Sequence, residues 1–354
     1  MDLKYLNAIN LLGSAKIGAL QKVADTFNGN FERAWHSHQL RSFLPADAPN
    51  KQRVDPKKEW EKLEKAGIEI ITILDPAYPE PLRQIADPPF LLYLKGNREA
   101  LKGDCFAVVG TRALTEYGKR VAPLIVEPLC QAGLIIVSGL AMGIDGLAHQ
   151  AAVKMNAPTI AVLGGGLSDN SIVLQNRKLA KEILQKNGAI ISEYPLGTEG
   201  NQFSFPQRNR IISGLSRGVL VIEADEKSGS LITAKCALDQ NRDVFAVPGS
   251  IFSSKSNGPN QLIAAGAKMV LDSSAILTEY NIDINVRQLA LPPVGGPANE
   301  LEKNIFAVIG KSSLSIDEII RASSKTAPEV ISCLMNLELE NKIINLGNNK
   351  FALP

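Results

Sequence analysis

Short segments rich in glycine, serine and threonine directly follow apolar runs of the sequence at five places. Backbone N–H groups in such turns bind anions, particularly where a helix begins, and glycine lets a phosphate approach the backbone closely. A single turn of this kind is better explained by a tight connection, whereas five at one edge of a sheet indicate a site for a phosphate-bearing ligand. The segments are Gly110-Thr111-Arg112, Ser138-Gly139, residues 164–166, Ser228-Gly229-Ser230 with Thr233, and residues 248–250.

The segment at residues 205–216 places two arginines on either side of an asparagine, at a helix start predicted near residue 209. Arginine binds phosphate through paired hydrogen bonds, and an aromatic ring ahead of it can stack on a base. The alternative is that one arginine pairs internally with Glu193, Glu223 or Asp145. We expect one arginine to be structural and one to face the ligand, with no preference between them. The candidate contact residues here are Phe205, Gln207, Arg208, Asn209 and Arg210.

Other kinds of site have little support in the sequence. The dinucleotide-binding pattern GxGxxG does not follow the first core strand, and the Gly-Lys-Ser/Thr pattern of nucleotide hydrolases is absent. The three histidines, His36, His38 and His149, are too few for a multi-histidine metal centre, and the four cysteines are scattered. We therefore expect no cofactor and no metal. We expect His149 to be a hydrogen-bonded core residue, which Asp145 could fix from one helical turn away.

The elements that must position these residues alternate along residues 104–285. Short apolar runs near residues 106, 134, 159, 189, 219, 244 and 268 are separated by stretches with helical periodicity. This alternation predicts an α/β fold, a Rossmann-like doubly wound and mainly parallel sheet with helices on both faces. Ligands of such sheets bind outside the carboxyl ends of the strands, where the glycine-rich segments lie.

Further domains are expected on both sides of this core. The last of them combines three helical stretches with two short strands around a turn, which is typical of a winged helix-turn-helix. The expected parts are an N-terminal helical domain at residues 1–45, a proline-rich connector packing on the core at 46–103, a Pro/Gly linker at 286–298, and the C-terminal winged helix at 299–354.

The composition is that of a globular protein without a strong charge imbalance. The 354 residues are 45% hydrophobic and 21% charged, with a net charge of +2. These values exclude a mainly disordered chain, and no apolar run reaches the length of about 18 residues that a membrane-spanning helix needs. No signal peptide is expected, so a cytoplasmic protein is the default. Without a basic tail, DNA binding would depend on a few cations placed in a local groove.

Several of these motifs together resemble the DNA processing protein DprA (Smf) family. They are Gly110-Thr111-Arg112, residues 138–145 with His149, residues 192–195, residues 205–216, and residues 228–233 followed by 243–249. The resemblance implies a non-enzymatic protein of natural transformation. Such a protein binds and protects incoming single-stranded DNA, forms a homodimer through its Rossmann-like domain, and loads the RecA recombinase. It also implies that Arg112 and neighbouring loops contact the DNA.

The chain departs from this family just before Asn176. Family members commonly carry a Tyr-Pro pair and then a basic residue there, whereas this chain has Ile172-Val173-Leu174-Gln175. Two explanations stay open at this point. Arg177 or Lys178 supplies the missing cation from the next helical turn, or binding is weaker.

Two other classes of protein remain as alternatives. A Rossmann-like nucleotide phosphoribohydrolase of the LOG type places a catalytic glutamate shortly after its glycine-rich loop, but here no carboxylate follows Thr233 before Asp239. A winged-helix transcription regulator needs cations on its recognition helix, whereas residues 328–340 hold three glutamates and no lysine or arginine. We therefore expect that the winged helix is not a sequence-specific reader of duplex DNA.

Overall fold

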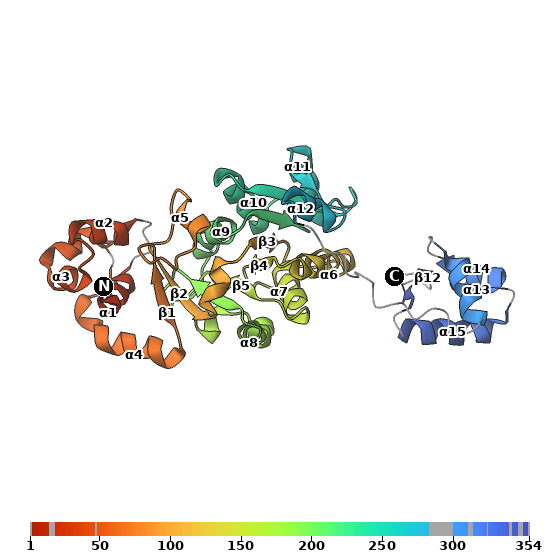
Figure 1. The fold of residues 1–354 in the computed structure, drawn as a ribbon, viewed down its shortest axis with the longest axis horizontal. Coiled ribbons are helices and arrows are strands. Elements are labelled where there is room, and N and C mark those ends of the chain that lie inside the picture. The colour runs from red at the N-terminus through yellow and green to blue at the C-terminus, as the bar shows by residue number, and fades with distance from the viewer. Residues whose placement is uncertain are drawn as a thin grey trace. The chain divides into compact units, whose positions relative to one another are not determined.

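The chain forms two compact units, Met1–Ile284 and Asn285–Pro354, each with its own hydrophobic core (Figure 1). The linker expected at residues 286–298 lies outside the described residues. The computed structural model describes residues 2–13, 18–46, 48–282, 300–310, 314–323, 325–339, 342–345 and 350–352.

A nine-stranded sheet forms the centre of the first unit. Its strands are β1 (Glu69–Thr72), β2 (Leu91–Gly96), β3 (Cys105–Val109), β4 (Ile135–Ser138), β5 (Thr159–Val162), β6 (Ala189–Ser192), β7 (Gly218–Val221), β8 (Asp243–Ala246) and β9 (Lys268–Met269). Their order across the sheet is β1-β2-β6-β5-β4-β3-β7-β8-β9. In this order, all neighbouring strands from β6 through β3 to β9 are parallel. Strand β2 pairs antiparallel with both β1 and β6. The predicted α/β fold with a mainly parallel sheet is therefore confirmed.

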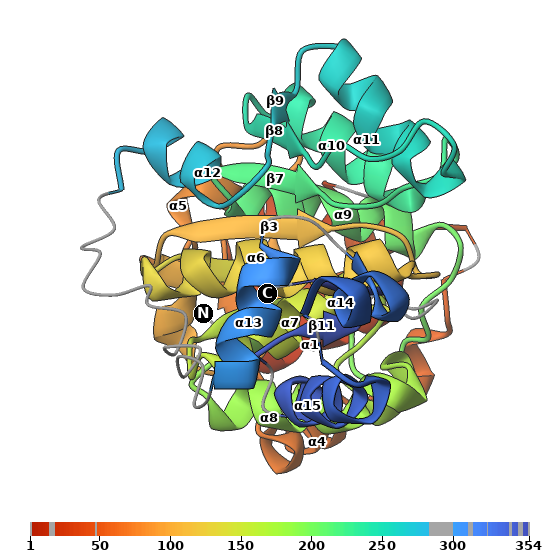
Figure 2. The same cartoon turned by 90° about the vertical axis from the view of Figure 1, so that its right-hand side faces the viewer.

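Helices cover both faces of this sheet. They are α5 (Glu80–Arg83), α6 (Glu116–Gln131), α7 (Ile144–Lys154), α8 (Arg177–Gln185), α9 (Ser204–Leu215), α10 (Gly229–Asp239), α11 (Ser254–Ala264) and α12 (Ser274–Glu279), with the 3-10 helices η3 (Arg98–Lys102), η4 (Asp169–Ser171) and η5 (Leu174–Asn176). Phe106 and Val108 of β3 share a core with α6 and α7, while Ala107 and Val109 face α9 and α10. This division follows from the two-residue period of a strand. Figure 2 shows α10 and α11 beside β8 and β9.

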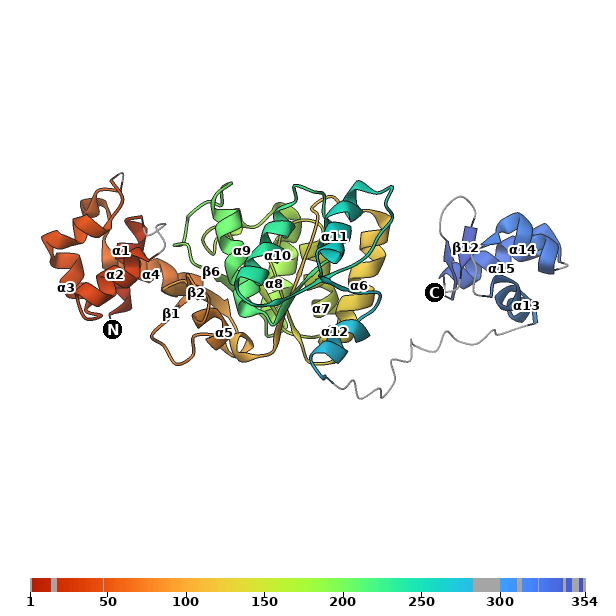
Figure 3. The ribbon, with the colours of Figure 1, turned by 90° about the horizontal axis from the view of Figure 1, so that it is seen from above.

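The N-terminal helices lie at the β1–β2 end of the sheet, as Figures 1 and 3 both show. They are α1 (Leu3–Leu11), α2 (Ala19–Thr26), α3 (Phe31–His36) and α4 (Pro56–Ala66), with the 3-10 helices η1 (His38–Phe43) and η2 (Lys51–Arg53). Their apolar side chains share one core with β2, β6 and α8. The Tyr93 hydroxyl of β2 donates to Asn7 at 2.7 Å and accepts from Asn10 at 2.9 Å. Polar contacts therefore join α1 to the sheet in addition to packing.

Two elements differ from the pattern expected from the sequence. The apolar runs of residues 46–103 form β1 and β2, and β2 pairs with β6, so this segment extends the sheet as well as packing on it. Helix α9 begins at Ser204, five residues before the predicted start. Pro206 lies in its first turn, where backbone N–H groups have no partner within the helix, so the ring interrupts no hydrogen bond.

The second unit has the architecture predicted for residues 299–354. It contains α13 (Glu300–Ile309), β10 (Leu314–Ser315), α14 (Ile316–Ser323), α15 (Ala327–Leu339), β11 (Ile344–Asn345) and β12 (Lys350–Ala352). Strand β12 pairs antiparallel with both β10 and β11. Ile305, Ile319 and Leu334 are almost fully buried and bring the three helices together. Three helices packed on a small sheet of this kind form a winged helix.

Candidate nucleic-acid interface

A pocket of about 420 Å³ lies outside the carboxyl ends of β3 and β7. These two strands are neighbours, but α6, which follows β3, and α10, which follows β7, cover opposite faces of the sheet. Such a divergence opens a crevice, which is the usual ligand site of a doubly wound sheet. The pocket walls come from the loops after β3, β4 and β7, from α9, and from Lys255 of α11.

The Gly110-Thr111-Arg112 loop forms one wall and is held from two sides. The backbone N–H of Thr111 donates to the Glu223 carbonyl at 2.6 Å, and the Thr111 carbonyl accepts from the N–H of Ile144 at 3.1 Å. Gly143 precedes Ile144 with a φ of +87°, and a side chain on it would collide with the Thr111 oxygen. Arg112 is exposed and therefore projects from a loop whose backbone is fixed.

The Glu223 carboxylate holds the end of the same loop through Thr115. It is one of the three acidic partners considered for the arginines, but it accepts from the Thr115 N–H at 3.2 Å and from the Thr115 hydroxyl. Glu223 is buried, and Thr115 is the N-cap of α6. A carboxylate at this end is favourable because the first turn of a helix has unpaired N–H groups and a positive dipole.

Phe205 lies in the pocket, and other groups already contact its ring. The ring packs so closely on Gly164 and Gly200 that a Cβ on Gly164 would approach it to 2.6 Å. The Arg112 guanidinium carbon lies 5.5 Å from the ring centroid, in cation–π contact. Phe205 therefore supports the Arg112 guanidinium. This contact was not predicted from the sequence, which indicated only base stacking for Phe205.

Arg208 and Asp145 also line the pocket, and both bind the backbone of Gly139. Arg208 donates to the carbonyls of Gly139, at 2.9 Å, and Val162, while Asp145 accepts from the N–H of Gly139 at 3.1 Å. Burial lowers the pKa of Arg208 to about 10, so the guanidinium stays charged at neutral pH. Burial raises the pKa of Asp145, and the Arg208 charge opposes that rise. The absence of a Cβ at Gly139 is what lets Arg208 approach.

His149 is a fully buried core residue, as predicted, but its partner differs. Its Nδ1 lies 2.8 Å from the Thr159 hydroxyl, and Asp145 instead binds the Gly139 N–H. The Thr159 hydroxyl donates to the Ile136 carbonyl at 2.6 Å, so it accepts from a protonated Nδ1. Burial, reinforced by the Arg208 charge, lowers the pKa of His149 to about 3.

The start of α10 also lines the pocket. Ser228, Gly229, Ser230 and Thr233 all line the pocket, and a Cβ on Gly229 would meet nothing within 4 Å. The N-terminus of this helix of 11 residues therefore opens toward the cavity with its positive dipole end.

Two lysines beside this helix were missed by sequence reasoning. Lys227 and Lys255 both line the pocket, and Lys255 pairs with Asp225 at 2.5 Å. Lys227 directly precedes the Ser228-Gly229 turn, so its position was a usable signal, whereas only the fold brings Lys255 there. Within the described part of the chain, no carboxylate forms an ion pair with Arg112 or Lys227. The pocket therefore presents unneutralised positive charge, which suits a phosphate.

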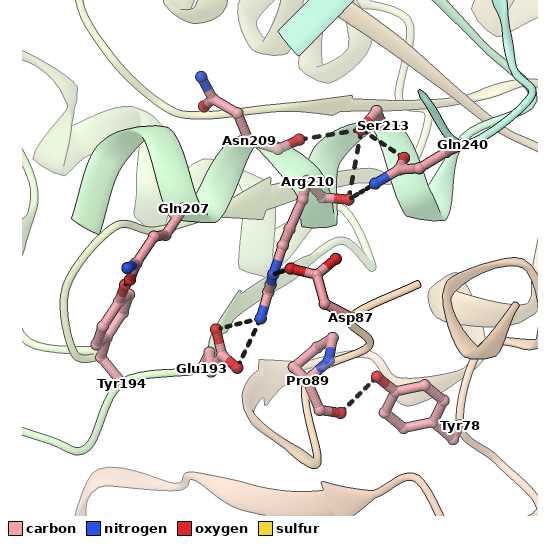
Figure 4. A network of polar contacts seen from close by, with 10 residues as sticks. All are labelled: Tyr78, Asp87, Pro89, Glu193, Tyr194, Gln207, Asn209, Arg210, Ser213 and Gln240. Carbon is pink, nitrogen blue, oxygen red and sulfur yellow. Dashed lines mark hydrogen bonds and ion pairs between the residues drawn. The ribbon is translucent and has the colours of Figure 1, made fainter. Parts of the chain in front are cut away.

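Arg210 of α9 does not line the pocket and is the structural arginine of the pair; Figure 4 shows its side chain reaching Asp87 and Glu193. Its Nε donates to Asp87 at 3.0 Å, and its Nη2 donates to both oxygens of Glu193 at 2.8 and 2.9 Å. Burial opposes its charge, but Glu193 and Asp87 raise its pKa. The internal pairing with Glu193 that was considered as an alternative is confirmed. Arg208 also makes internal contacts, although it lines the pocket.

The remaining predicted residues divide between the pocket and its surroundings. Asn209 lines the pocket and donates to the Gly229 carbonyl at 3.1 Å. Ser138 is buried and binds the Val108 carbonyl, and Gln207 accepts from the Tyr194 hydroxyl at 2.9 Å. Lys178 is exposed on α8, pairs with Glu182 at 3.6 Å, and does not line the pocket.

Three of the five glycine-rich segments do not line the pocket: Ser138-Gly139, residues 164–166 and residues 248–250. Residues 164–166 pack against Phe205, Pro195 and Thr198, so there the glycines serve tight packing. Residues 248–250 follow β8, and Gly249 bonds Asn260 of α11. Among the described residues, no group of three His, Cys, Asp or Glu side chains could hold a metal ion. None of the described helices is both long and apolar enough to span a bilayer.

Comparison with protein families gives two matches. The family model for DNA recombination-mediator protein A matches residues 69–281, and the DprA winged helix domain matches residues 290–349. The chain is 40% identical over 296 residues to Protein Smf of Escherichia coli, covering 80% of this chain and 78% of that protein. It is 46% identical over 214 residues to DNA processing protein DprA of Bacillus subtilis, covering 60% of this chain and 71% of the relative.

The solved structures similar to the chain include two DNA processing proteins. DNA processing protein A from Streptococcus pneumoniae aligns with a TM-score of 0.67 at 35% identity, over 79% of this chain and 98% of that one. DNA processing protein A from Helicobacter pylori, described with a single-stranded DNA binding mode, aligns with a TM-score of 0.54 at 30% identity. This second alignment covers 60% of the present chain and 95% of the other.

Proposed function

The chain belongs to the DNA recombination-mediator protein A (DprA/Smf) family, and from this premise we propose that it binds single-stranded DNA as a recombination mediator of natural transformation. The observation that carries this proposal is the pocket at the β3–β7 edge. Arg112 and Lys227, which form no ion pair among the described residues, line this pocket together with the N-terminus of α10. Related proteins named for DNA processing, and a relative described with single-stranded DNA binding, support the same function.

We propose that the pocket binds the sugar–phosphate backbone and tolerates any sequence. Its walls offer N–H groups, hydroxyls and cations, which contact phosphates and carry little information about base identity. The test compares labelled single-stranded and duplex oligonucleotides of equal length across a salt series. Preferential single-strand binding is expected, with a log–log slope of about −0.7 for each phosphate neutralised. Equal affinity for duplex, or a strong preference for one base sequence, would contradict the proposal.

The proposed function also includes two protein partners, a second copy of this chain and RecA. We propose that the protein is a non-enzymatic cytoplasmic homodimer that protects incoming strands and promotes assembly of RecA on them. Met269 and Leu271 are 51% and 70% exposed at the β9 edge of the sheet and supply an apolar surface for dimerisation. Val244, Val247 and Val270 from the same part of the sheet are packed in the core and do not belong to this surface.

Each partner has its own measurement. Light scattering at micromolar concentration should give the dimer mass, and Leu271→Glu should give the monomer mass. Addition of the protein should accelerate RecA assembly on single-stranded DNA. A monomeric wild type, or RecA assembly that the protein leaves unchanged, would remove the corresponding part of the proposal.

A further inference from the structure

The loop between β8 and α11 exposes the least covered aromatic side chain of the described residues. Phe252 is 95% exposed, and its neighbour Ile251 is 80% exposed. Apolar side chains that protrude in this way often mark a contact surface. Phe205, the aromatic residue expected to stack on a base, is already in contact with Arg112 and two glycines.

The loop that carries Phe252 is held in a defined conformation. Gly249 exchanges two hydrogen bonds with Asn260 of α11, at 3.0 and 3.1 Å. The Ser250 carbonyl accepts from the Ser253 N–H at 3.0 Å, which closes a turn around Ile251 and Phe252. The two side chains are therefore presented from an anchored turn.

One end of this turn is bonded to α6, and the other end leads into α11, which supplies Lys255 to the pocket. On one side, the Tyr117 hydroxyl, in the first turn of α6, donates to the Pro248 carbonyl at 2.7 Å. On the other side, Lys255 lines the pocket only three residues after Phe252. Three residues span at most about 11 Å. The Phe252 backbone therefore lies within about 11 Å of the backbone of Lys255, a residue that lines the pocket.

We propose that Phe252 stacks on a base of the single strand whose phosphates occupy the pocket. This inference rests on the proposed function and extends the contact surface past the pocket walls. A single strand of DNA needs two kinds of contact. Its phosphates bind cations, and its unstacked bases bind flat apolar surfaces. Arg112 and Lys227, which line the pocket, meet the first need, and Phe252 meets the second. Stacking on phenylalanine accepts every base, which agrees with sequence-tolerant binding.

The experiment separates stacking from charge by removing the bases. Wild type, Phe252→Ala and Phe252→Tyr are titrated with an oligothymidine and with an abasic strand of equal length and charge. Phe252→Ala should weaken oligothymidine binding about fivefold or more, whereas Phe252→Tyr should bind like wild type. On the abasic strand the variants should not differ, and the salt slope should stay unchanged because no cation is lost. Leu124→Ala, which removes a side chain 62% exposed on α6, is the matched control and should have no effect.

The outcomes distinguish this inference from the proposed function. Failure of the wild type to bind single strands would overturn both. Wild-type binding that Arg112→Ala weakens and Phe252→Ala does not would overturn the inference alone. An equal loss on both strands, or a dimer that dissociates on Phe252→Ala in light scattering, would also overturn it, the latter by identifying the loop as a protein contact.

Discussion

Arg112 and Arg210 occupy two regions that use the same side chain in opposite ways. Arg210 is 5% exposed, and two carboxylates, from the connector and from the end of β6, surround it. Arg112 is exposed and rests on a phenylalanine ring, with no ion-pair partner among the described residues. The comparison shows that available carboxylates decide the role of an arginine. An arginine that is paired with carboxylates of the same chain holds the fold together. An arginine without such a partner, at the edge of the sheet, is available for a ligand.

The Arg210 region also explains how parts distant in sequence are held together. Asp87 precedes β2, Glu193 follows β6, and Arg210 lies on α9, so one guanidinium joins three elements (Figure 4). The Arg210 backbone carbonyl additionally accepts from Gln240, at the end of α10, at 3.0 Å. The Arg112 guanidinium joins no carboxylates in this way among the described residues, and it rests on the Phe205 ring.

The largest expected effect is on stability, from Arg210→Ala. Removing the guanidinium leaves Asp87 and Glu193 without their shared partner, and breaking a buried pair in this way costs about 3 kcal/mol or more. Denaturant unfolding followed by circular dichroism measures the loss. Arg210→Lys, which keeps the charge and loses the bidentate geometry, should fall between wild type and Arg210→Ala. A loss below about 1 kcal/mol for Arg210→Ala would show that the pairing is not structural.

Next comes Arg112→Ala, which should change binding and leave the unfolding midpoint unchanged. Affinity for single-stranded DNA should fall several-fold for any sequence, and the salt slope should become shallower by about 0.7, because one phosphate contact is lost. Anisotropy titrations at several salt concentrations provide both values. Arg41→Ala removes an exposed arginine of the N-terminal helices and serves as the control. Unchanged affinity with an intact fold would remove Arg112 from the site.

The stability of the first unit should respond to acid through the buried His149. Its pKa in the folded protein is about 3, below the ordinary 6.5, so the unfolded chain takes up the proton first. The free energy of unfolding should therefore fall as the pH falls below 6.5, by about 1 kcal/mol between pH 6.5 and 5.5. His149→Asn should lose this contribution. Unfolding curves of both proteins at several pH values test the slope, and parallel pH profiles would argue against it.

The smallest effect is expected from removing the winged helix. Residues 299–354 hold six Lys/Arg against seven Asp/Glu, and Glu329 on α15 accepts from Thr326 at the helix start. An acidic module is repelled by duplex DNA, and part of its charge is used in capping. Deleting residues 299–354 should leave single-strand affinity within about twofold of the full chain, a change of less than about 0.5 kcal/mol. Submicromolar duplex binding by this module at physiological salt would contradict the charge argument.

Local sequence patterns were sufficient to predict the core elements. Short apolar runs separated by helical periodicity correspond to the parallel strands from β3 to β9, because burial on both faces of the central strands favours apolar residues in them. The same reasoning did not predict that β1 and β2 join the sheet. Their pairing depends on which distant strand edge is free, and a local pattern carries no information about that edge.

The sequence by itself determined the α/β core, the winged helix and the glycine-rich turns after the strands, since these depend on residues close together along the chain. It also placed Arg112, Ser228 and Gly229 among the candidate contacts, and all three line the pocket. The tertiary structure alone decided how the other charges are used. Arg210 is paired because residues 87 and 193 reach it, and Lys255 joins the pocket because α11 packs beside the β7 loop. Pairing of charges depends on distance in space, and only the folded chain sets that distance.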